Sequence, residues 1–188
     1  MNHELILTLV ADDVEIEGIK ALQTENLRTN ISEEEAFSQG FLTASYTMEY
    51  LRAMNAITPT VIAKDGDSIA GYAMVTTKEV KDGHPLMADL IDTIDRTLYK
   101  DQLLIESHYV VVGQLCVAKP YRGMGLVQKL YGHFRDCYAD QFEYLITDVA
   151  QANTRSLKAH LKTGFQVIDT LTYGGIGWDI VLWDWKKG

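Results

Sequence analysis

The chain has 188 residues, of which 47% are apolar and only three are proline. This composition is typical of one globular domain rather than of a linker or a disordered segment. No stretch reaches the roughly 18 consecutive apolar residues of a membrane span, and the first residues lack a basic region followed by an apolar one. We therefore expect a cytoplasmic protein with a single domain over residues 1–188.

The net charge of -9 argues against nucleic acid as a partner, because phosphate backbones are bound by clustered Lys and Arg. The charge is uneven, since residues 114–165 hold seven Lys and Arg against four Asp and Glu, whereas the remainder is strongly acidic. One local region could therefore hold an anionic ligand, and the rest would favour a cationic partner. The cysteines and histidines fit no zinc or redox spacing, so no protein-bound metal is expected.

The first half of the chain alternates between helical and extended patterns. Residues 4–10 form an apolar run typical of a strand covered on both faces, and Asp12 with Glu15 starts a helix as a capping box. A second box at residues 32–35 opens a short helix that ends near Gly40, and residues 46–54 suggest a third. Strands at 61–63 and 69–75 are predicted to form a hairpin through the Asp-Gly turn at Gly66.

A helical insertion is expected at about residues 78–108. Its helix starts at Pro85, and Leu86, Leu90, Ile94 and Leu98 recur every four residues. Residues 109–117 then form the strongest strand of the chain, which we predict to be the central one, with a bulge or close approach at Gly113. A helix after residue 125, a strand at 144–149, a helix from 153 and strands at 166–171 and 178–185 complete a mixed α/β domain.

A glycine turn links the predicted central strand to the helix that follows it. Gly123 and Gly125 carry no side chains there, so successive backbone N–H groups can converge beside the positive helix N-terminus. This arrangement is typical of a phosphate site. A dinucleotide-binding turn would need a third glycine where Gln128 stands, and no P-loop lysine is present. The remaining alternative is a turn that only connects strand and helix.

A second polar motif follows the next strand. Asn153, Ser156 and His160 share one helical face by their spacing, so they can line one wall of a site. In the alternative, Asn153 is only the helix N-cap and His160 a surface residue.

Together, the two motifs resemble the GCN5-related N-acetyltransferase (GNAT) superfamily. Its signatures read Val-x-Pro-x-x-Arg/Gln-x-x-Gly-x-Gly/Ala and, downstream, Asn-x-x-Ala-x-x-Leu-Tyr-x-x-x-Gly-Phe, and they match here in order over residues 111–165. The resemblance implies a single-domain GNAT-like α/β fold, with a mixed central sheet, flanking helices and a splayed central strand pair. It also implies acetyl-CoA as co-substrate and a cofactor-binding core at about residues 109–165.

The resemblance assigns the CoA site residue by residue. Leu115, Cys116 and Val117 would pair through their backbone with the pantetheine arm, and Asn153 and Ser156 would face it. Lys119, Lys129 and Lys158 are candidates for contacts with the phosphates. The pyrophosphate would be held by the amides of Arg122, Gly123, Met124, Gly125, Leu126 and Val127.

The catalytic residues of this chain depart from the family pattern. His160 stands where the family usually has the tyrosine that protonates the departing thiolate, and Gln114 stands where many relatives have a glutamate base. Glu106 and His108, just before the central strand, are therefore candidates for the base, with Asp148 a weaker one.

The expected reaction is direct transfer of an acetyl group to a primary amine, without a covalent enzyme intermediate. The alternatives are a non-catalytic acyl-CoA-binding sensor or structural subunit and a nucleotide-binding oxidoreductase. We expect the insertion to shape the acceptor site, and its helix with Asp89, Asp92 and Asp95 to favour cationic small molecules. The sequence leaves the acceptor, the acyl length and the oligomeric state open, a homodimer included.

Overall fold

The structure, a computed structural model, describes residues 5–39 and 41–186, without the side chains of residues 37–39. The predicted Glu4 and Gly40 boundaries lie outside these residues. Within them, no helix is both long and apolar enough to cross a membrane. The helices are α1 (Asp13–Glu25), α2 (Glu33–Gln39), α3 (Met48–Ile57), α4 (Pro85–Arg96), α5 (Leu126–Tyr138) and α6 (Thr154–Thr163), with short 3-10 turns η1 (Lys78–Gly83), η2 (Leu104–Glu106) and η3 (Lys119–Tyr121).

Seven strands form the main sheet, in the order β1-β2-β3-β6-β7-β9-β8. They are β1 (Ile6–Leu9), β2 (Val61–Asp65), β3 (Ser68–Thr76), β6 (Tyr109–Val117), β7 (Tyr144–Ala150), β8 (Gln166–Tyr173) and β9 (Ile176–Asp184). Among the described strands of this sheet, only β6 and β7 pair in parallel, and their pairing covers residues 109–111 and 144–146. Beyond Val111 the two strands diverge, which confirms the expected mixed sheet with a splayed central pair.

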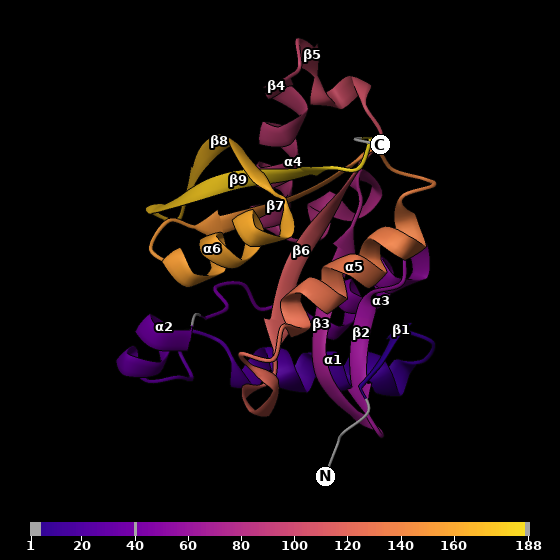
Figure 1. The fold of residues 1–188 in the computed structure, drawn as a ribbon, viewed down its shortest axis with the longest axis vertical. Coiled ribbons are helices and arrows are strands. Elements are labelled where there is room, and N and C mark those ends of the chain that lie inside the picture. Colours follow the sequence, from indigo (N-terminus) through magenta and orange to yellow (C-terminus); the bar gives the residue numbers. More distant parts are fainter. Residues whose placement is uncertain (1–4, 40, 187–188) are drawn as a thin grey trace.

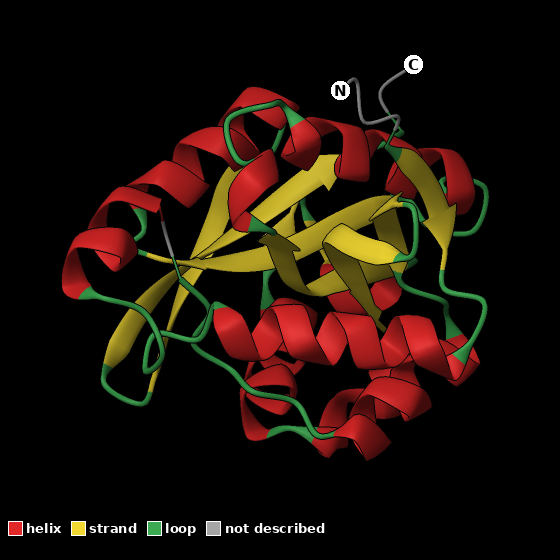
Figure 2. Ribbon diagram, turned by 90° about the horizontal axis from the view of Figure 1, so that it is seen from below, coloured by secondary structure: helices red, strands yellow, loops and turns green. Residues whose placement is uncertain are grey.

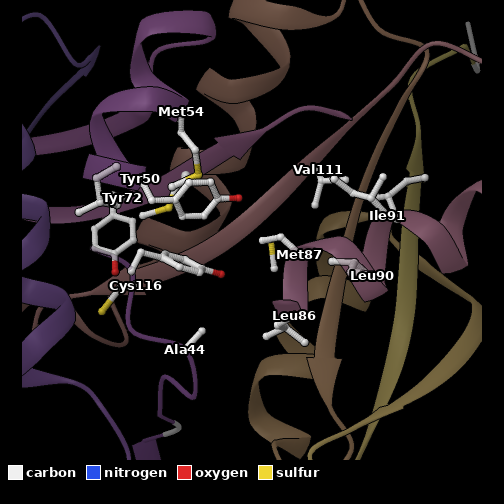
Figure 3. Close-up of a cluster of buried hydrophobic side chains, with 14 of the residues drawn as sticks. Ala44, Tyr50, Met54, Tyr72, Leu86, Met87, Leu90, Ile91, Val111 and Cys116 are labelled. Atoms are coloured by element: carbon white, nitrogen blue, oxygen red, sulfur yellow. The ribbon is translucent and has the colours of Figure 1, made fainter. Parts of the chain in front are cut away.

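Helices cover both faces of the sheet (Figures 1 and 2). One apolar core joins α1, α3 and α4 to the first face, and a second joins α5 and the start of α6 to the other. Figure 3 shows part of the first core, where Tyr50 and Met54 lie near Tyr72 of β3, and Leu90 and Ile91 lie beside Val111 of β6. These cores hold β6 between two helical layers. The carboxyl-terminal part of β6, which does not pair with β7, is therefore held in place by its packing.

The insertion between β3 and β6 contains η1, α4, a two-stranded hairpin of β4 (Leu98–Tyr99) and β5 (Gln102–Leu103), and η2. The predicted helix ends earlier than its four-residue repeat suggested, because Arg96 is its last residue. Leu98 starts the hairpin instead and is 66% exposed.

Gly113 interrupts β6 as predicted. The register with β3 shifts between Met74 and Val75, so Gly113 has no partner in the ladder. A Cβ atom at this glycine would lie 2.3 Å from Oγ1 of Thr76, a distance at which one of the two must move. The glycine therefore permits both the bulge and the close packing of β3 against the central strand.

Candidate active site

The carboxyl-terminal half of β6 has one free edge in the described sheet, because β7 has diverged from it. The amide of Ala118 donates to the carbonyl of Ala70 at 2.9 Å, on the β3 side. Backbone groups of successive strand residues point to alternate edges. The amides of Leu115 and Val117 therefore point to the free edge, where an extended ligand could pair with them.

The glycine turn that follows places the N-terminus of α5 beside this edge. Gly123 and Gly125 have positive φ values of 79° and 74°, a conformation that costs glycine little. Gly125 is the N-cap residue, and no described side chain caps the helix. The first amides of α5 therefore have no side-chain cap among the described residues, and with the helix dipole they suit a phosphate group.

Arg122 closes the turn against the amino-terminal part of the chain. Its Nε donates to the carbonyl of Val117 at 3.2 Å, and its guanidinium binds Asn26 and the carboxylate of Glu35 on α2. Lys119, a candidate for phosphate contacts, also pairs with Glu35 at 3.1 Å. Mainly the Lys119 hydrogen bond lowers the pKa of Glu35. An acidic side chain thus holds two cations of the predicted phosphate region.

The α6 helix supplies the opposite wall. Asn153 is its N-cap and accepts from the amide of Ser156 at 3.2 Å, as the capping alternative expected. It also lines the larger cavity, so the two interpretations of this residue are compatible. His160 is 5% exposed, with Nδ1 2.7 Å from the carbonyl of Ser156 and Nε2 2.6 Å from the Tyr131 hydroxyl of α5.

The hydrogen bonds of His160 define the tautomer of its neutral ring. A carbonyl can only accept, so Nδ1 carries a proton, and in the neutral ring Nε2 accepts from Tyr131. Burial lowers the pKa of His160 and favours this neutral form. The alternative in which His160 is a surface residue is therefore wrong. The neutral ring, hydrogen-bonded at both nitrogens, is poorly suited to the role of thiolate acid that the resemblance implied.

Two cavities meet between β6 and α6. The larger, of about 390 Å³, follows the free edge of β6, the glycine turn and α6. The smaller, of about 90 Å³, continues toward β7, β9 and α4. Residues lining both are Phe41, Leu42, Leu115, Asn153, Ser156 and His160. The junction of the cavities therefore lies at the edge of β6, beside His160.

Asp148 of β7 lines the smaller cavity. Its Oδ2 is shielded from solvent and has no hydrogen-bond partner among the described residues. Burial raises the pKa of this carboxyl to about 7, because the charged form loses its hydration. A carboxyl of this pKa can accept a proton near neutral pH.

Gln114 links the wall of the smaller cavity to the core. Its Oε1 accepts hydrogen bonds from Nε2 of Gln23 at 2.8 Å and from the hydroxyl of Tyr72 at 2.7 Å, while its Nε2 donates to the carbonyl of Ala44 at 2.9 Å. Gln23 in turn accepts from the amide of Tyr46. This network, which Lys20 also joins through Gln23, ties the segment before α3 to the central strand, so Gln114 acts as a structural anchor.

Most of the predicted CoA-site residues line the larger cavity. The cavity is lined by Leu115, Cys116, Val117, Arg122, Gly123, Gly125, Leu126, Val127, Asn153 and Ser156, whereas Met124 lies outside the lining and is 60% exposed. The lining also includes residues that the sequence analysis did not assign to the site: Asn26, Tyr121, Gln128, Arg155 and Lys162. The helical spacing of residues 155 and 162 on α6 was the available signal.

The other catalytic and acceptor candidates are not brought to the cavities. Glu106 and His108 are exposed at the opposite end of β6 and line neither cavity. The α4 carboxylates also lie outside both linings, and two of them pair with lysines, Asp92 with Lys81 and Asp95 with Lys78. The insertion contributes Leu86 to the smaller cavity instead.

Comparisons with known proteins agree with this geometry. A model of the acetyltransferase (GNAT) family matches residues 25–165. No curated protein gives a significant match.

Similar solved structures support the same fold. A GNAT acetyltransferase from Streptococcus agalactiae is 16% identical, with a TM-score of 0.66 over 97% of this chain and 96% of that one. A putative acetyltransferase from Salmonella typhimurium with its cofactor acetyl-CoA is 12% identical, with a TM-score of 0.62 over 98% and 95% of the chains. A chain of the NatC complex bound to Gag peptide and CoA is 14% identical, with a TM-score of 0.64 over 96% and 98%.

These structural identities establish a shared fold only. The family model, however, spans well over half of the chain. The protein therefore belongs to the GNAT acetyltransferase family.

Proposed function

We propose that this acetyltransferase transfers the acetyl group of acetyl-CoA to a primary amine, by direct attack of the amine on the thioester. The observation that carries the proposal is the pair of cavities that meet at the free edge of β6, one suited to the donor and one lined by Asp148, whose Oδ2 is shielded from solvent. Direct attack requires both reactants at one junction, and such a junction is present beside His160.

The larger cavity fits the acyl donor. The free amides of Leu115 and Val117 would pair with the amide groups of pantetheine, and the uncapped N-terminus of α5 would hold the pyrophosphate. Bound acetyl-CoA supplies the thioester carbonyl that the amine attacks. One of the β6 amides would donate a hydrogen bond to the carbonyl oxygen as negative charge develops there. Two of the similar structures contain CoA or acetyl-CoA, which agrees with this donor.

The smaller cavity fits the acceptor amine, with Asp148 as its base. The amine nitrogen forms a bond to the carbonyl carbon, the carbon–sulfur bond breaks, and a proton of the amine passes to the carboxylate of Asp148. The pKa of about 7 lets this carboxylate accept the proton and release it again near neutral pH. Neither Glu106 nor His108 is placed to do so.

The departing thiolate needs little help from an acid. A thiol has an ordinary pKa of about 8.5, so its thiolate is a good leaving group. His160 lines the junction, but its ring is neutral and its Nε2 is already bound to Tyr131. We assign it the role of shaping the junction rather than that of proton donor.

The test is release of CoA thiol from acetyl-CoA with a panel of amines, for the wild type and Asp148→Asn. We expect Asp148→Asn to lower turnover by roughly 10²- to 10⁴-fold while CoA affinity, measured by calorimetry, is unchanged. Asp179→Asn, outside both cavity linings on β9, is the control and should keep wild-type turnover.

The two alternatives predict other results. A non-catalytic acyl-CoA sensor would bind CoA and release no thiol with any amine. A nucleotide-binding oxidoreductase would bind NAD rather than CoA, and membership of the GNAT family argues against it. Wild-type turnover in Asp148→Asn would show that another group is the base.

A further inference from the structure

The charge of the smaller cavity restricts the acceptor. Its lining contains the Asp148 carboxyl but no lysine or arginine among the described residues. A carboxylate next to the reacting amine would therefore lie near a like charge with no cation to pair with it. The cavity consequently suits an amine whose neighbouring groups are neutral.

A buried donor is unpartnered in the same cavity. Trp178 lines it and is 6% exposed, and its indole Nε1 has no hydrogen-bond partner in the described part of the chain. Buried polar groups are nearly always hydrogen-bonded, so an unpaired one marks a position where a ligand atom could bind. Of the six described side chains with such an unpaired atom, only Asp148 and Trp178 line either cavity.

The strand register places this donor and the Asp148 acceptor on one face of the sheet. Asp148 pairs with Ile180, and Ala150, two residues further along β7, pairs with Trp178. Side chains two residues apart on a strand share a face, so Asp148 and Trp178 are diagonal neighbours. Diagonal neighbours are roughly 7–8 Å apart, which leaves space for a ligand group between a carboxylate and an indole.

We propose that the acceptor is an α-amino amide, such as the first residue of a peptide. Its amine binds at Asp148, and the carbonyl oxygen on the adjacent carbon accepts a hydrogen bond from Nε1 of Trp178. This inference rests on the proposed function and narrows its acceptor from any primary amine to one with a neutral carbonyl beside the nitrogen. A free amino acid, which carries a carboxylate at that position, is excluded by the charge of the cavity.

The experiment compares kcat/KM at saturating acetyl-CoA for L-alaninamide, L-alanine and isopropylamine, in the wild type and Trp178→Phe. Phenylalanine keeps an aromatic ring and removes the N–H donor. We expect Trp178→Phe to lower kcat/KM for alaninamide by roughly three- to tenfold and to leave that for isopropylamine within twofold. Comparing each amine between the two proteins cancels the different basicities of the amines. Alanine should be a poor substrate of both.

Trp185→Phe is the matched control, because Trp185 is also buried with an unpartnered Nε1 but lines neither cavity. It should not change the preference among the amines. Equal losses for alaninamide and isopropylamine in Trp178→Phe would overturn the inference, as would efficient use of alanine. Acetylation of simple amines with no dependence on the carbonyl would leave the proposed function intact, whereas no acetylation of any amine would overturn both.

Discussion

The Tyr131 hydroxyl of α5 lies 2.6 Å from Nε2 of His160 on α6, so two helices that line the larger cavity are joined by a buried hydrogen bond. His160→Phe would leave the fully buried Tyr131 hydroxyl without a partner and should lower the free energy of unfolding by about 1–3 kcal/mol. Adding Tyr131→Phe removes both polar partners, so the double variant should regain most of the loss. Urea unfolding of the wild type, His160→Phe, Tyr131→Phe and the double variant measures these free energies. If the losses of the two single variants add up in the double variant, the hydrogen bond contributes little.

The same substitution tests the role of His160 in turnover. Because the ring is neutral and its Nε2 is occupied, His160→Phe should keep turnover within about tenfold of the wild type and leave its pH dependence unchanged. A loss of 10² or more with intact CoA affinity would instead support the thiolate acid that the resemblance implied. CoA affinity of the same preparation, measured by calorimetry, controls for folding.

The Gln114 network should make Gln114→Glu sensitive to pH. A glutamate still accepts from Gln23 and Tyr72, but its ionised form cannot donate to the carbonyl of Ala44. Burial should raise the folded pKa of this new carboxyl above its unfolded value of about 4.3. Its neutral form keeps the donor, so stability should be near wild type below about pH 4 and fall as pH rises through the folded pKa.

Urea unfolding of wild type and Gln114→Glu at pH 4 and pH 8 measures this difference. The loss should be about 1–3 kcal/mol at pH 8 and much smaller at pH 4. The wild type at each pH corrects for all other titrating groups. The same loss at both pH values would mean that the loss does not come from the hydrogen bond donated to the carbonyl of Ala44.

The pKa of Asp148 predicts an acidic limb in the activity profile. A base with a pKa of about 7 is mostly protonated below that pH, so kcat/KM for the amine should fall about tenfold per pH unit there. Asp148→Asn, measured with the same amine, should keep only the limb caused by protonation of the amine itself. The ratio of wild-type to variant kcat/KM should therefore fall about tenfold per pH unit below about pH 7. A ratio that does not change with pH would assign the additional titration to another group.

Glu35 should weaken CoA binding, because its carboxylate forms ion pairs with Lys119 and Arg122, which we propose to lie near the CoA phosphates. Glu35→Gln frees these cations and removes a negative charge near the incoming phosphates. We expect CoA affinity to rise roughly two- to fivefold at low salt, with a smaller gain at high salt because of screening. Glu33→Gln, an exposed change of the same charge on α2, is the control. Weaker binding in Glu35→Gln would mean that Glu35 is needed to position Arg122.

Local patterns predicted the fold and most of the residues that line the larger cavity, which we propose as the donor site. Apolar periodicity located β6 and α5, and the glycines at 123 and 125 marked the turn between them, because backbone conformation there is set by adjacent residues. Gly113 likewise marked the bulge.

The acceptor half depends on contacts between distant residues, which local patterns do not contain. The side-chain amide of Gln114 is hydrogen-bonded by residues 23, 44 and 72, and the pKa of Asp148 depends on the burial that the whole fold imposes. From the sequence, Glu106 and His108 were preferred to Asp148 as the base because they directly precede β6. Their distance from the cavities depends on the fold and could not be predicted from the sequence.

Gly125 offers a direct test of the proposed donor site. Its φ is 74°, and only Oε1 of Gln128, at 3.9 Å, lies within 4 Å of the position that a Cβ atom would take. Gly125→Glu adds a side chain in a left-handed conformation, at a cost of about 1–2 kcal/mol, and a negative charge beside the uncapped amides of α5. We expect CoA affinity to fall by more than about 100-fold, since the charge faces the pyrophosphate position. Gly174→Glu is a matched control, with a φ of 58° and no atom near its Cβ position, but in the β8–β9 turn outside both cavity linings. It should carry a similar conformational cost and bind CoA normally. Calorimetric titration of both folded variants with CoA decides the matter: unchanged affinity in Gly125→Glu would remove the glycine turn from the donor site.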